Sequence, residues 1–228
     1  MDQILMALRS ANPNLLIEEV TDPSFRQYGQ LLPHFQFPEM KRYIYEETPI
    51  PADVTCSPEL MAMDEAIQIT QYVYGETACQ VGYFSDSPDH MNALEYHKCS
   101  ELLVEFEPCV IIVGQIWQIE QDRLNAADLK VFYVPADTCL ELYATTLHFA
   151  PCAATTAGVR QVVCQTATTN TPLHHPERRD LTGENKYLLQ RNKWVIAHKD
   201  AAPMFDETVW MGIEGENLAV IPVAKREV

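Results

Sequence analysis

Hydrophobic residues in the first third of the chain recur every three or four positions, which predicts short helices. The segments with this spacing are residues 2–9, 23–32 and 58–72. A capping residue directly before a proline marks the start of the last two, Asp22 in one case and Ser57 in the other. A short strand is predicted over residues 15–20, and the proline-rich stretch 33–58 predicts irregular chain.

From residue 79 onward the pattern changes to short apolar or alternating runs, which are typical of β-strands. The predicted strands are residues 79–84, 93–98, 101–106, 109–116, 129–134, 139–148, 159–164, 192–198 and 218–223. Such a series favours a β-barrel or sandwich. We therefore expect a mainly β fold in one structural unit. Residues 1–75 would form an N-terminal helical or irregular segment that packs on the barrel, and residues 76–228 the barrel with a C-terminal extension.

Charge and cysteine content exclude several classes of partner. The 228 residues carry a net charge of −16, which argues against nucleic-acid binding and against a polybasic membrane anchor. The longest apolar run, residues 109–113, is far shorter than the roughly 20 residues of a membrane helix. Seven cysteines without a CxxC pair favour reduced thiols, so we expect a cytoplasmic protein. With nucleic acid and membrane excluded as partners, we expect it to act on a small molecule.

The densest group of potential metal ligands lies in residues 95–101. Side chains two apart on a strand share a face, so Glu95 and His97 point the same way, and Glu101 joins them if no bulge intervenes. A later predicted strand ends at His148, shortly before Pro151. If both strands face one interior, they form a mixed nitrogen and oxygen site, which suits Zn, Mn, Fe or Ni better than Ca or Mg.

The spacing Glu95-x-His97-x3-Glu101 followed by His148 resembles the two motifs of the cupin superfamily. The resemblance implies a double-stranded β-helix, the RmlC-like jelly-roll barrel, with N-terminal helices. It also implies a divalent transition metal held by Glu95, His97 and His148. The usual first motif begins His-x-His, and this chain has Glu95 at the position of the first histidine. A carboxylate is itself a good ligand for the same metals.

Three stretches are similar to the ureidoglycolate lyase branch of the cupins, namely residues 20–29, 94–102 and 130–148. The C-terminal stretch after residue 155 has no counterpart there, so we interpret the chain as an uncharacterised side family of that branch. The resemblance implies a lyase or isomerase for a small polar metabolite such as a hydroxy acid, a carbohydrate or a sugar acid. We also expect a homodimer, because cupin barrels commonly pair through edge strands that need covering.

In the enzyme hypothesis, Glu101 or Glu141 moves a proton beside the metal. The basic run 178–199 offers Arg178, Arg191 and Lys193 to hold a substrate carboxylate or phosphate. Two alternatives stay open. A non-catalytic cupin would bind a sugar or metabolite without turnover, and a structural protein would use the same residues in an internal hydrogen-bond network.

Overall fold

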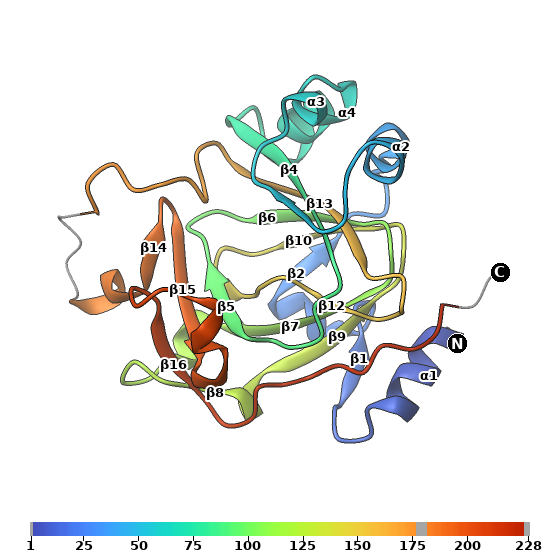
Figure 1. Ribbon diagram of the computed structural model, residues 1–228. Coiled ribbons are helices and arrows are strands. Elements are labelled where there is room, and N and C mark those ends of the chain that lie inside the picture. Colours follow the sequence, from blue (N-terminus) through green and yellow to red (C-terminus); the bar gives the residue numbers. More distant parts are fainter. Residues whose placement is uncertain (1, 177–181, 226–228) are drawn as a thin grey trace.

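The computed structural model describes residues 2–176 and 182–225 and is mainly β (Figure 1). Its helices are α1 (Gln3–Ala11), α2 (Pro38–Glu46), α3 (Pro58–Met61) and α4 (Asp64–Gln68). Shorter helical turns are η1 (Pro23–Gln27), η2 (Ile69–Val73), η3 (Ile116–Gln118), η4 (Ala126–Asp128), η6 (Gly183–Tyr187) and η7 (Lys199–Met204). Among these residues no helix is both long and apolar enough to span a membrane.

The strands follow one another along most of the chain. They are β1 (Ile17–Glu19), β2 (Gly29–Leu31), β3 (Ala52–Val54), β4 (Cys79–Asp86), β5 (Ala93–Tyr96), β6 (Glu101–Glu105), β7 (Cys109–Gln115), β8 (Leu124–Asn125), β9 (Lys130–Val134), β10 (Thr138–Leu142), β11 (Thr146–Leu147), β12 (Cys152–Ala153), β13 (Val159–Thr166), β14 (Leu188–Gln190), β15 (Lys193–His198) and β16 (Trp210–Glu214).

In the described part of the chain these strands form three sheets. The first has the order β1-β9-β7-β11, with β12 also paired to β7, and the second has the order β2-β10-β6-β13-β4-β3. The third has the order β14-β15-β16-β8, with β5 paired to β15. Because β1, β2 and β3 precede residue 75, the N-terminal segment supplies strands to the sheets as well as helices that cover them.

An apolar core fills the space between the first two sheets. Leu103 of β6 and Phe132 of β9 lie in it, while their chain neighbours Val104 and Val131 belong to other clusters. This alternation follows from the two-residue period of a strand. It gives each sheet an inward face. The inward face of the second sheet also carries polar residues of the site, namely Glu101, Gln161 and Gln165. The strand order is that of facing sheets, and a closed jelly-roll barrel stays a prediction.

The helices α2, α3 and α4 cover the outer face of the second sheet (Figure 1). Met40 and Ile44 of α2 are fully buried there, each worth roughly 1.5–3 kcal/mol of burial. Helix α2 lies in the stretch that we predicted to be irregular, and that prediction was wrong. Pro38 occupies the first turn of the helix, where a proline is tolerated because its missing N–H needs no partner.

The sequence predicted the strands more accurately than the helices. The predicted strand 218–223 is present only as isolated bridges, whereas every other predicted strand overlaps an observed one. The predicted helix 58–72 is divided into α3, α4 and the π-helical turn η2. Strand β16, which we did not predict, pairs in parallel with β15 and extends the third sheet.

Candidate metal centre

The backbones of Glu95 and His148 bring the two motif segments together. Glu95 lies in β5, and His148 directly follows β11. Each residue donates its N–H to the carbonyl oxygen of the other, with N–O distances of 2.6 Å for the Glu95 amide and 2.9 Å for the His148 amide. Residues directly opposite each other in an antiparallel pair project their side chains from the same face. The two side chains therefore start from neighbouring positions.

His97 and Glu101 reach the same place through a turn between two sheets. Strand β5 ends at Tyr96, and β6 begins at Glu101 in the second sheet. Asn192 stabilises this turn, since its side-chain Oδ1 accepts a hydrogen bond of 2.8 Å from the Lys98 amide. Glu101 thus joins the group because the chain changes sheet, and not because one strand continues through residues 95–101.

Together these residues form a compact and buried cluster. Glu95, His97, Glu101 and His148 each offer one ligand atom, and these four atoms lie within 4.8 Å of one another. The His97 Nε2 atom lies 3.5 Å from Glu95 Oε1 and 3.2 Å from Glu101 Oε2, while His148 Nε2 lies 3.4 Å from Glu101 Oε1. All four residues are at most 8% exposed. Two carboxylates in such a place need cations to offset their lost hydration.

Both imidazole rings are oriented by hydrogen bonds on their far side. The His97 Nδ1 donates to the carbonyl of Asn192 at 2.7 Å, and the His148 Nδ1 donates to the carbonyl of Thr146 at 2.9 Å. A carbonyl oxygen only accepts, so each Nδ1 carries the proton and each Nε2 faces the carboxylates. Metal-binding histidines are typically held in this way, with one ring nitrogen bonded to the protein and the other toward the ion.

The opposite charges in the cluster shift the pKa values of one another. Burial raises the pKa of the Glu95 carboxyl, but Lys193, His97 and His148 outweigh it and hold that pKa at about 2. Burial likewise opposes the charging of His97, yet hydrogen bonds with Glu101 and Glu95 raise its pKa to about 10. The pKa of Glu101 lies well below its usual value, because the two histidines outweigh burial. In the metal-free protein His97 is therefore protonated, and its positive charge lies where a metal cation would bind.

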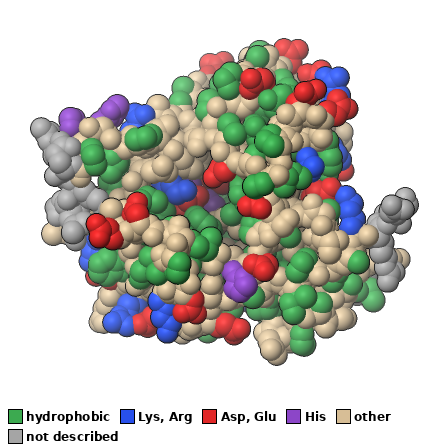
Figure 2. All heavy atoms as spheres, viewed as in Figure 1, with side chains coloured by type: hydrophobic (Ala, Val, Ile, Leu, Met, Phe, Trp, Pro, Cys, Tyr) green, Lys and Arg blue, Asp and Glu red, His purple; other side chains and the backbone are tan. Residues whose placement is uncertain are grey.

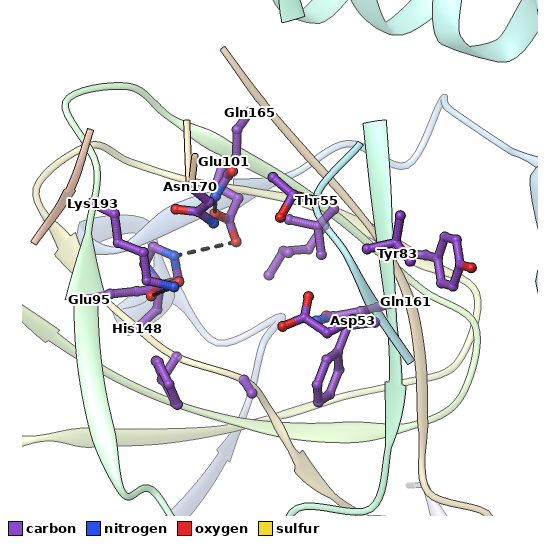
Figure 3. A pocket seen from close by; sticks show the side chains of 16 residues that line it. Asp53, Thr55, Tyr83, Glu95, Glu101, His148, Gln161, Gln165, Asn170 and Lys193 are labelled. Atoms are coloured by element: carbon purple, nitrogen blue, oxygen red, sulfur yellow. Dashed lines mark hydrogen bonds and ion pairs between the residues drawn. The ribbon is translucent and has the colours of Figure 1, made fainter. Parts of the chain in front are cut away.

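Glu95, Glu101 and His148 of the cluster line one wall of a cavity of about 110 Å³, and His97 lies behind that wall (Figure 3). Lys193 of β15 lies beside it, and its Nζ forms an ion pair with Glu95 Oε2. Gln165 of β13 donates its side-chain amide to Glu101 Oε2. The opposite wall carries Asp53 and Gln161 (Figure 3). The cavity therefore presents a cluster of metal-ligand type on one side and free polar groups on the other.

Of the other predicted site residues that the structure describes, Lys193 lines this cavity, whereas Arg191 and Glu141 do not. Arg191 donates to Thr171 Oγ1 and contacts the ring of His174, so it points away from the pocket. Glu141 accepts a hydrogen bond from Gln30 and does not line the pocket, because its strand directs the neighbouring Leu140 and Leu142 inward. The predicted roles of Arg191 and Glu141 stay predictions. Arg178 lies outside the described residues.

Several residues of the site were missed from the sequence. Gln161, Val163 and Gln165 alternate along β13 and all line the cavity, so two polar residues at a spacing of four on one strand face were the available signal. Asp53 and Asn192 gave no such signal. Their positions depend on strand pairing and on a hairpin turn, which are tertiary features.

Comparison with known proteins places the chain in a family. Residues 17–218 match the profile of the family described as "Domain of unknown function (DUF4867)". The chain belongs to this family. No curated protein matches the chain, so the resemblance to the ureidoglycolate lyase branch stays a prediction.

Among solved structures, similarity is found to the "non-heme alpha ketoglutarate dependent epimerase SnoN from nogalamycin biosynthesis". The two chains are 12% identical, with a TM-score of 0.36, and the match covers 78% of this chain and 90% of the other. Similarity at this level assigns neither an activity nor a ligand to the protein.

Proposed function

We propose that the protein is a metal-dependent enzyme of the cupin type, a lyase or an isomerase that acts on a small polar metabolite. The observation that carries the proposal is the meeting of Glu95, His97, Glu101 and His148, all buried, in one cluster, of which Glu95, Glu101 and His148 line an accessible cavity. Buried carboxylates and imidazoles that share one space are the donor set of a transition-metal site.

Glu95, His97 and His148 would hold the ion. The oriented Nε2 atoms of both histidines face this position, with the Gln165 side-chain amide 3.1 Å from His97 Nε2, and Glu95 Oε1 faces it too, because Lys193 pairs with the other oxygen of Glu95. Nitrogen and carboxylate ligands suit Zn, Mn, Fe or Ni. A bound ion of this kind supplies Lewis acidity, which polarises a carbonyl or hydroxyl oxygen of the substrate.

Glu101 is the group that we assign to proton transfer. Its two oxygens lie against the two imidazoles, and Gln165 fixes the carboxylate in place. A carboxylate held beside a polarised substrate oxygen can take a proton from the adjacent carbon, which is the step that lyases and isomerases share. The low pKa of Glu101 keeps this carboxylate in its charged form.

Metal analysis of the purified protein tests the first half of the proposal. We expect close to one equivalent of a transition metal per chain, and a rise in melting temperature when Mn, Zn, Ni or Fe is added to the metal-free protein. His97→Ala and His148→Ala should each remove both effects, whereas His34→Ala, which changes an exposed histidine, should change neither. Less than a tenth of an equivalent, with no thermal shift, would overturn the metal site.

Proton exchange separates the enzyme from a non-catalytic binding protein. We would incubate the metal-loaded protein in D₂O with hydroxy acids, sugars and amino sugars and follow their masses and proton spectra. A lyase or isomerase introduces deuterium at carbon or releases new products. Compounds that raise the melting temperature but gain no deuterium and give no product would support the alternative, a cupin that binds a sugar or metabolite.

A further inference from the structure

The cavity opens outward into a larger groove. This groove has a volume of about 800 Å³ and shares Asp53, Phe84, Phe149 and Ala150 with the inner cavity. The two spaces are therefore one continuous opening that leads to the cluster. Figure 2 shows a hollow in this face of the molecule with acidic side chains along its border. We call the outer groove the vestibule.

The lining of the vestibule is strongly acidic. Its carboxylates are Asp53, Asp86, Asp89, Asp200 and Glu216. Among the residues that the structure describes, neither lysine nor arginine lines the vestibule. His90 does line it, but its Nδ1 is already bonded to Asp89 at 2.6 Å. A surface of one sign raises the local concentration of opposite charges and repels like charges, so the vestibule disfavours an anionic substrate.

Two groups inside the opening are unpartnered and face the cluster across the cavity (Figure 3). Gln161 is only 4% exposed, and its Oε1 has no hydrogen-bond partner. Asp53 lies beside it on the edge strand β3 and lines both the cavity and the vestibule. Within residues 2–176 and 182–225, no side chain forms a hydrogen bond or ion pair with the Asp53 carboxylate, and the charges of Lys193 and Glu95, which line the same cavity, act on it in opposite directions. A buried amide without a partner is costly, and a ligand can supply that partner.

We infer that the cavity binds a small polyhydroxylated molecule that carries a primary ammonium group. The ammonium group would be held by Asp53, and the hydroxyl groups would lie toward Gln161 and the cluster. This inference rests on the proposed function, because it takes the cavity as the substrate site. It replaces the hydroxy acid and sugar acid that the sequence suggested. Lys193, the one predicted anion anchor in the cavity, is already paired with Glu95.

A matched set of three sugars tests the inference. D-glucosamine, D-glucose and D-glucuronate have one ring size and differ in charge, and their dissociation constants can be measured by calorimetry below the pKa of the amine. We expect glucosamine to bind at least about tenfold more tightly than glucose, as a charged hydrogen bond is worth roughly 1.5–3 kcal/mol. Glucuronate should bind more weakly than glucose. Added salt should weaken the binding of glucosamine more than the binding of glucose or glucuronate.

Two variants locate the effect. Asp53→Asn should bring glucosamine and glucose to within about twofold of each other, and its metal content should stay unchanged. Glu120→Gln removes one exposed acidic charge that lines neither space and should keep the wild-type preference. Equal binding of glucosamine and glucose by the wild type, preferred binding of glucuronate, or no binding of glucosamine at millimolar concentration would overturn the inference. Since sugar binding and metal content are measured separately, failure of the metal site would be recognised as such.

Discussion

Glu95 and His148 exchange both of their backbone hydrogen bonds, and this pairing is the link between the two halves of the site. It places a carboxylate from β5 beside an imidazole from the end of β11, although the two lie far apart in the chain. His97 and Glu101 then need only the turn after β5 to complete the cluster. The metal-ligand geometry is thus built mainly by main-chain pairing, which does not depend on the metal.

The ion pair between Glu95 and Lys193 should matter for stability. Both side chains are largely buried, with 10% and 17% of their area exposed. Glu95→Gln would leave the Lys193 ammonium group buried without its partner, and removing one member of such a pair costs about 3 kcal/mol. Urea unfolding of the metal-free protein measures this loss. Lys193→Met combined with Glu95→Gln should recover part of it, and strictly additive losses would contradict the coupling.

Glu101 should be needed for proton transfer but not for metal binding. In Glu101→Gln the side chain keeps its shape and loses its capacity to accept a proton. We expect metal content to stay near the wild-type value and deuterium incorporation into a substrate to fall by at least about a hundredfold, the usual scale of general base catalysis. Metal analysis and exchange rates, measured on the same preparation, check both parts. Loss of the metal in this variant would make Glu101 a ligand instead.

Asn192 should act as a positioning residue for His97. Its φ angle is +55°, and its carbonyl accepts the proton of His97 Nδ1. Asn192→Gly and Asn192→Ala both lose the side-chain bond to Lys98, but only glycine adopts this backbone conformation without strain. The alanine variant should be less stable by about 1 kcal/mol and should bind metal more weakly than the glycine variant. Equal affinities in a metal titration would argue against the positioning role.

Another buried carboxyl, that of Glu105, should make the stability of the fold depend on pH. It is fully buried, the weakly donating Cys109 thiol lies beside it, and burial raises its pKa from 4.5 to about 8. Between these two values the unfolded chain has released a proton that the folded chain keeps. The stabilising contribution of the neutral carboxyl is therefore complete below pH 4.5 and is lost as the pH rises through about 8.

Glu105→Gln removes this titration. The variant should show a flatter stability profile between pH 4.5 and 8 and should be more stable than the wild type above that range by up to about 5 kcal/mol, the free energy that corresponds to the pKa difference between 4.5 and 8. Denaturant unfolding at a series of pH values measures the effect, with Glu120→Gln as the control for an exposed glutamate. Parallel profiles for the Glu105 variant and the wild type would show that this carboxyl does not titrate in the fold.

The sequence predicted those features that depend on local pattern. The strands followed from two-residue alternation, and the segments around His97 and His148 were recognised from spacing. Helix α2 was missed because Pro38 was taken as a breaker, although proline is compatible with the first turn. The mainly β class was predicted correctly, and the closed jelly-roll barrel stays a prediction.

The rest of the site depends on contacts that only folding creates. Lys193 stood out as a positive charge, but nothing local indicates that Glu95 neutralises it across the β15–β5 pair. Asp53 faces the cluster only because β3 pairs with β4 at the edge of the second sheet. The charge of the vestibule likewise comes from segments that are separate in sequence, among them β3, the end of β4 and η7. These features led us to infer an amine as the substrate, where the sequence had suggested a hydroxy acid, a carbohydrate or a sugar acid.

An anomalous-difference map from crystals of the metal-loaded protein, recorded at the absorption edge of the bound metal, tests the central claim most directly. We predict one strong peak between His97 Nε2, His148 Nε2 and the Glu95 carboxylate, at about 2.0–2.2 Å from each ligand atom. The peak should be absent from crystals of His148→Ala. A peak elsewhere in the molecule, or none at this cluster in protein that carries a full equivalent of metal, would contradict the claim.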